Sequence, residues 1–145
     1  MTMNATRLKR QVSGWVVAAC GAWLIALGMY FVFVRPALLP EDVSFMGTTL
    51  TQVRIVVPGL EGWLRHVFTV LGGFMATAGV LSVVVGRVVM PTRPKGAAWA
   101  ILLAGVLGVA LMSATNFALH SDFMWLLLLP ALAWFAGCAS YLAGH

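Results

Sequence analysis

The chain has 145 residues, of which 61% are hydrophobic and only 9% are charged, with a formal net charge of +5. A soluble domain carries about 25% charged residues because it must present a polar surface to water, so an ordinary soluble protein is excluded. The nine Lys and Arg residues stand near the ends of apolar runs, as in membrane proteins, so a nucleic-acid-binding role is excluded as well.

Four stretches are long and apolar enough to cross a membrane. A helix needs about 20 mainly apolar residues to cross roughly 30 Å of hydrocarbon, and only helices and closed barrels satisfy their backbone groups in lipid. Strand-like alternation is absent, which favours helices. We predict an all-α, antiparallel four-helix transmembrane bundle forming a single domain over residues 1–145. The predicted spans are about 12–34, 67–90, 97–119 and 123–143.

The start of the chain resembles a targeting signal, because Arg7, Lys9 and Arg10 precede an apolar run. Residues 17–20 (VAAC) also resemble a lipoprotein cleavage site. The apolar run continues to Val34, however, and is longer than the hydrophobic region of a signal peptide. We therefore expect an uncleaved first helix.

The distribution of charge predicts the orientation, because Lys and Arg are concentrated in cytoplasmic loops. With both termini in the cytoplasm, only Arg35, Arg54 and Arg65 among the basic residues fall outside, together with all four acidic residues. The basic residues placed in the cytoplasm are Arg7, Lys9, Arg10, Arg87, Arg93 and Lys95.

The one long connection, residues 35–66, follows the first span. Its apolar residues recur at steps of three and four, which is typical of an amphipathic helix, and Pro58 and Gly59 are expected to divide it into two pieces. We expect this segment in the outer interface over the mouth of the bundle, either as a cap that fills space or as a lid over a binding cavity. The apolar positions are Leu50, Val53, Val56, Val57, Leu60, Trp63 and Leu64.

Small residues at regular steps let membrane helices pack closely. These stripes either hold the bundle together or bind a second copy or a larger complex. The second span has Gly72, Gly79 and Gly86 at intervals of seven. The stripes of the first and third spans are Gly14, Ala18, Ala22 and Ala26, and Ala100, Ala104 and Gly108.

Polar residues gather at the predicted outer ends of the spans and form the candidate site. They are expected to cap helices, to hold a polar head group, or to bind a metal or act as an acid–base pair. The chain lacks His-x-x-x-His, Cys-x-x-Cys and Glu-x-x-His spacings, so we assign no catalytic residue, metal ligand or cofactor. The candidate ligand-binding residues are Arg35, Glu61, His66, Asn116, His120 and Asp122.

Two cysteines and two tryptophans lie within the predicted spans. Cys20 and Cys138 are placed in the cytoplasmic half, where thiols stay reduced, and are interpreted as apolar filling. Trp23 and Trp134 either face lipid or fill the bundle, or they line an apolar cavity with Met29, Met75 and Met112.

Three segments carry a family resemblance: residues 35–42 (RPALLPED), 71–74 (LGGF) and 116–125 (NFALHSDFMW). In these, the chain resembles small uncharacterised bacterial four-helix inner-membrane proteins, DoxX-like in layout. The resemblance implies the helix plan and a bacterial inner-membrane location, but no catalytic residues. DoxX itself is associated, as a partner, with membrane oxidoreductase and redox-stress complexes.

Two functional hypotheses follow. The first is a non-enzymatic subunit or scaffold of a membrane complex, with lipids, a second copy or a larger complex as partners. It predicts no cavity and no convergence of the outer polar residues. The second is a lipid- or small-molecule-binding protein, either a transporter or a membrane enzyme. It predicts an outward-facing pocket under residues 43–63 with a few convergent polar groups. The absence of a buried charge within any span favours the first hypothesis.

Overall fold

The computed structural model describes residues 2–143, with side chains from Gln11 onward, and has no strand in this range. Four helical stretches in it are long and apolar enough to cross a membrane, which confirms the predicted all-helical class and number of spans. They are Gln11–Phe33, Leu60–Thr92, Ala97–Ala118 and Met124–Leu142. The helices, with two π-helical turns η1 and η2, are α1 (Thr2–Phe33), α2 (Pro40–Phe45), α3 (Leu50–Val56), α4 (Leu60–Val84), η1 (Val85–Val89), α5 (Met90–Thr92), α6 (Ala97–Gly105), η2 (Val106–Ala110), α7 (Leu111–Ala118) and α8 (Met124–Leu142).

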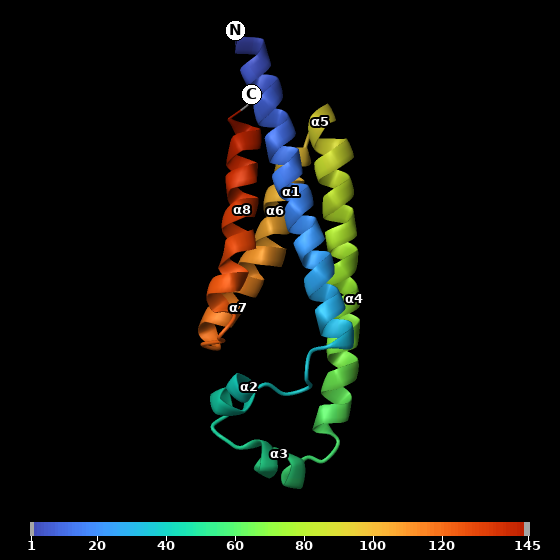
Figure 1. Ribbon diagram of the computed structural model, residues 1–145, viewed down its shortest axis with the longest axis vertical. Helices are drawn as coiled ribbons and strands as arrows, with labels where there is room; N and C mark the ends of the chain where they lie inside the picture. Colours follow the sequence, from blue (N-terminus) through green and yellow to red (C-terminus); the bar gives the residue numbers. More distant parts are fainter. Residues whose placement is uncertain (1, 144–145) are drawn as a thin grey trace.

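Helices α1 and α4 lie side by side over most of their length (Figure 1). Three glycines of α1 and three of the continuous stretch α4–η1 make the contact, and the first along α1 faces the last along α4–η1, so the two helices run in opposite directions. A Cβ atom added at Gly21 would lie 2.7 Å from the carbonyl oxygen of Gly79, and one at Gly72 would lie 2.6 Å from that of Gly28. The pairs are Gly14 with Gly86, Gly21 with Gly79, and Gly28 with Gly72.

The stripe predicted for the first span is therefore only partly correct. Gly14 and Ala18 are buried, but Ala22 and Ala26 are exposed, and Gly21 and Gly28 occupy the contact. The reason is geometric. A step of four residues drifts by about 40° around a helix of 3.6 residues per turn, whereas a step of seven returns to within about 20° of the same line.

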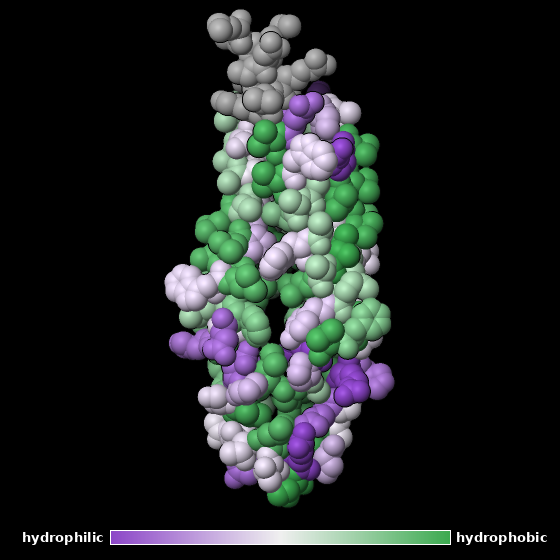
Figure 2. Space-filling model, in the orientation of Figure 1, coloured by the Kyte–Doolittle hydropathy of each residue, from purple (hydrophilic) through white to green (hydrophobic). Residues whose placement is uncertain are grey.

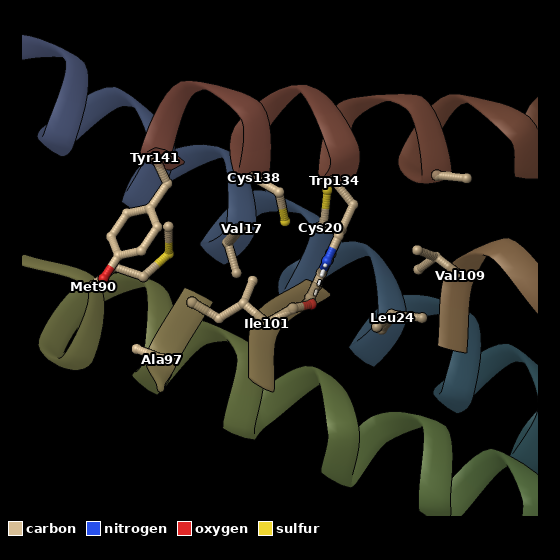
Figure 3. Packing of buried hydrophobic residues seen from close by; sticks show 11 residues of the cluster. Val17, Cys20, Leu24, Met90, Ala97, Ile101, Val109, Trp134, Cys138 and Tyr141 are labelled. Carbon is tan, nitrogen blue, oxygen red and sulfur yellow. Dashed lines mark hydrogen bonds between the residues drawn. The ribbon is translucent and has the colours of Figure 1, made fainter. Parts of the chain in front are cut away.

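The second pair of long helices, α6–η2–α7 and α8, is joined around Trp134. Its side chain is 4% exposed, whereas that of Trp23 is 39% exposed. The Trp134 indole Nε1–H donates a hydrogen bond of 3.0 Å to the Ile101 carbonyl oxygen, drawn as a dashed line in Figure 3. Gly105 leaves room for this ring, because any Cβ there would collide with the indole. Trp134 thus fills the bundle, and Trp23 lies on the outer surface.

Two π-helical turns interrupt the long helices. At the end of η1, the Met90 N–H donates a hydrogen bond five residues back to the Val85 carbonyl, and Pro91, which has no N–H, comes next. The wider turn accommodates the backbone around this proline. The turn η2 follows Gly105, where the indole of Trp134 packs against the helix. Such turns form where an ordinary helical ladder is disturbed.

The packed core lies in one half of the molecule. Its cluster of buried residues, shown in Figure 3, extends no further along α1 than Leu24, along η2 than Val109, and along α8 than Ala131. Both described ends of the chain lie at this end of the molecule, and α1 and α7–α8 draw apart toward α2 and α3 (Figure 1). The two helical hairpins are thus joined at one end and separated at the other.

Two cation–π contacts bracket the α1–α4 hairpin. The Arg87 guanidinium lies 3.5 Å from the ring centroid of Trp15, and that of Arg35 lies 3.7 Å from the ring centroid of Phe68. From Phe68 to Arg87 along the helix, a rise of 1.5 Å per residue gives about 30 Å. This spacing equals the hydrocarbon thickness of a bilayer. Helix α4 continues beyond Phe68 to Leu60, so it is longer than the predicted span.

Candidate functional site

Arg35 anchors the start of the long loop at the separated end of the molecule. Its guanidinium donates hydrogen bonds of 2.9 Å to the Pro36 carbonyl and 3.3 Å to Asp42 Oδ2. The side chain is only 9% exposed because it lies over the ring of Phe68. The Arg35 guanidinium makes both the cation–π contact and the ion pair. These two contacts hold the start of the loop against the ends of α1 and α4.

Asp42 and Glu41 make α2 a link between the two hairpins. Asp42 Oδ2 also accepts the Leu39 N–H at 2.8 Å, which fixes the start of α2. Its neighbour Glu41 accepts a hydrogen bond of 3.1 Å from Ser121 Oγ, in the turn between α7 and α8. Ser121 is 3% exposed. The two adjacent carboxylates therefore contact different hairpins. Asp42 contacts the α1–α4 hairpin through Arg35, and Glu41 contacts the α7–α8 turn through Ser121.

The six predicted site residues are not linked to one another. In the part of the chain that the structure describes, no hydrogen bond or ion pair joins any two of them. Glu61 pairs with Arg54 at 2.9 Å on the exposed surface. His66 Nδ1 lies 2.8 Å from the Gly62 carbonyl oxygen of its own helix.

The remaining predicted residues lie around the turn between α7 and α8. Asn116 Nδ2 donates to the Met112 carbonyl at 2.9 Å within its own helix. His120 is exposed and adopts a left-handed backbone conformation with φ of 51° just after α7, and Asp122 is exposed beside it. Arg35 is thus the one predicted residue that takes part in the link through α2.

Three residues of this link, Glu41, Asp42 and Ser121, are missing from the predicted set. Pro40 at the first turn of α2, followed by two acidic residues, is a recognisable helix start. That pattern identifies the helix, but it does not identify what the carboxylates contact. Ser121 lies 80 positions from Glu41 in the sequence, and no local pattern predicts their pairing.

The described residues hold no group of three or more His, Cys, Asp and Glu side chains arranged to bind a metal ion. Both cysteines are free and buried. Figure 3 shows their sulfur atoms among the apolar side chains between α1 and α8, and the Cys20 thiol lies 3.6 Å from the Pro130 carbonyl oxygen. Both thiols lie within the packed core.

Two hollows lie at the separated end. Figure 2 shows an opening through the molecule between the ends of α7 and α8 on one side and α1 on the other, above α2 and α3. A second, mainly apolar hollow of about 410 Å³ lies within the loop region itself. It is lined by Met46, Thr48, Gln52, Val53, Val56, Val57 and Leu60.

No protein-family model, curated protein or solved structure matches this chain.

Proposed function

We propose that this chain is a small, non-enzymatic subunit or scaffold of a complex in a bacterial inner membrane. It forms an antiparallel four-helix bundle with both termini in the cytoplasm and with α2 and α3 on the extracytoplasmic side. The third span, α6–η2–α7, is the surface that binds the partner. The DoxX-like layout of the sequence agrees with a role as a partner in membrane complexes.

The placement in the membrane is supported by the two cation–π contacts. They mark two planes about 30 Å apart, with Arg87 at one and Arg35 at the other. Arg93 and Lys95 belong to the turn at the Arg87 end, and Arg93 Nη2 donates a hydrogen bond of 2.6 Å to the Tyr141 carbonyl there. All four acidic residues lie toward the Arg35 end in the sequence plan, so the positive-inside rule places the Arg87 end in the cytoplasm.

The exposed small-residue stripe on the third span carries the functional proposal. Ala100, Ala104 and Gly108 recur at steps of four and are all exposed, and a Cβ added at Gly108 would have nothing within 4 Å. The three glycines of α1 and their partners Gly72, Gly79 and Gly86, in contrast, are used within the chain. A pair of small residues four positions apart, such as Ala100 and Ala104, allows another helix to approach closely, and such packing is one source of helix association in lipid.

A photo-crosslinking experiment in native membranes tests this function. A photoactivatable amino acid at Leu107, beside the stripe, should give a crosslinked product of discrete mass. Ala104→Leu should lower its yield about tenfold, the effect of losing roughly 1.4 kcal/mol of packing. The control is the same amino acid at Leu129 of α8, which is equally exposed and should give only lipid adducts. Equal products at both positions, or none at Leu107, would contradict the proposal.

A further inference from the structure

Beyond a role as a subunit, we propose that Arg87 and Trp15 form a binding site for the phosphate group of an anionic phospholipid, at the end of the molecule where the two hairpins are joined. The Arg87 guanidinium donates to the phosphate oxygens, and the acyl chains of the lipid lie along the outer surface of α4. The site rests on the placement in the membrane given under the proposed function, and it is independent of partner binding at the third span.

Trp15 holds the Arg87 guanidinium in one orientation. The central carbon of this group lies 3.5 Å from the centroid of the ring. At that distance the planar group must lie nearly parallel to the ring, because an edge-on approach would bring a nitrogen closer than van der Waals contact. The preceding residues, Gly14 and Gly86, pack against each other, so the backbone at both positions is fixed. The N–H groups therefore point outward in the plane of the guanidinium, the geometry that suits a phosphate.

Arg35, which stacks on Phe68 at the other end of the hairpin, shows by contrast what Arg87 lacks. The Arg35 guanidinium donates to the Pro36 carbonyl and to Asp42, and its side chain is only 9% exposed. Arg87 is exposed, and no acceptor within residues 11–143 receives any of its N–H groups. One stacked arginine is thus satisfied by the chain itself, whereas the other has its donors available to a ligand.

No Asp or Glu of the sequence lies close enough to neutralise Arg87. Glu61 belongs to the same continuous helical stretch but lies at its far end, about 40 Å away at 1.5 Å per residue. The other three acidic residues belong to α2 and to the turn between α7 and α8, which are also remote from η1 (Figure 1). The positive charge of this end is therefore complementary to an anion. Its basic residues are Arg7, Lys9, Arg10, Arg87, Arg93 and Lys95.

The depth of the site identifies the anion as a lipid head group. The contact between Arg87 and Trp15 marks one of the two planes about 30 Å apart, which is the boundary between hydrocarbon and head groups. Phospholipid phosphates lie at this boundary, where tryptophan is also concentrated. One and two turns further into the bilayer, Val84 and Val80 are exposed and offer contact to acyl chains. A lipid without an ammonium group is favoured, because the basic residues of this end repel that group.

Native mass spectrometry with defined lipids tests the site on the full chain. Delipidated protein in detergent, at physiological ionic strength, is titrated with phosphatidylglycerol, and the Kd of the first lipid adduct is measured. Arg87→Gln should raise this Kd about tenfold to hundredfold, the range for hydrogen bonds to a charged group. The matched control is Arg65→Gln, which removes an exposed arginine of the same helical stretch that stacks on no ring among the described residues. It should raise the Kd no more than about threefold.

Three further variants separate geometry from charge. Arg87→Lys keeps the charge but loses the planar fork, so its Kd should stay at least about fivefold above that of the native protein. Trp15→Leu removes the ring and should raise the Kd about threefold to tenfold, whereas Trp15→Phe, which keeps an aromatic face, should restore binding. Both side chains are exposed, so the packed core is intact in every variant.

Four outcomes would overturn the proposal. Unchanged affinity in Arg87→Gln would show that the lipid binds elsewhere, and full affinity in Arg87→Lys would show that charge alone is sufficient. The other two need only the native protein. Phosphatidylethanolamine should bind at least about fivefold more weakly than phosphatidylglycerol, and equal affinity would reveal a surface that does not select anionic lipid. An adduct of inorganic phosphate with the same Kd would reveal a site for the free ion.

Discussion

Replacing Gly72 by alanine should lower the free energy of unfolding by about 1–3 kcal/mol, the usual effect of overfilling a packed interface. The new methyl group would lie 2.6 Å from the Gly28 carbonyl oxygen. Because that oxygen belongs to the backbone of α1, it cannot rotate away, and the two helices must separate. Gly21 and Gly79 should respond in the same way, since each faces backbone atoms of the other helix.

The neighbouring Gly73 provides the matched control. A Cβ atom there would have nothing within 4 Å, so Gly73→Ala should leave stability unchanged or raise it by up to about 1 kcal/mol through helix propensity. Reversible unfolding by titration with a denaturing detergent in bicelles measures both variants. Equal effects at the two positions would show that α1 and α4 do not meet along this glycine line.

Truncating Trp134 to alanine should lower the free energy of unfolding by about 3–5 kcal/mol, the range for large aromatic side chains in packed cores. The ring fills the space above Gly105 and takes part in the cluster that joins the two hairpins. Trp134→Phe keeps most of the ring but leaves the Ile101 carbonyl without the indole donor, at a cost of about 1–3 kcal/mol.

Trp23 is the control for this second prediction, because it also belongs to a membrane span but its side chain lies on the surface. Trp23→Phe should change stability by less than about 0.5 kcal/mol. The same bicelle titration compares the variants. If Trp23→Phe were as harmful as Trp134→Phe, the assignment of Trp134 to the interior and of Trp23 to the lipid-facing surface would be wrong.

Hydropathy alone was sufficient to predict the four spans, because a helix in lipid must satisfy its own backbone and needs a fixed apolar length. The break in the loop was also predictable. Pro58 and Gly59 separate α3 from α4, as their conformational preferences require. These are local properties, and each can be recognised without knowledge of any other segment.

The parts that could not be predicted depend on pairs of distant residues. Gly21 and Gly28 of α1 can be recognised as contact residues only when the facing glycines of the second span are known. The sequence of α1 alone therefore did not distinguish them from the exposed Ala22 and Ala26. The pairing of Glu41 with Ser121 is of the same kind. The polar residues His66 and Asn116 each have a hydrogen-bond partner within their own helix, and their proposed role in ligand binding stays a prediction.

The packing suggests a division of roles among the helices. Helix α1 contacts both α4 and α8, so most of the packing between the two hairpins involves α1. The third span has its small-residue stripe on the exposed side, available to a partner.

Native mass spectrometry of the protein, extracted from its own membrane with minimal detergent, tests the proposed subunit role most directly. It records the mass of the assembly and any bound lipid in the same spectrum. The proposed function predicts an assembly larger than the 15.5 kDa chain, lost in Ala104→Leu and retained in Leu129→Ala. A single chain of that mass in all three preparations, with no partner, would contradict the subunit role.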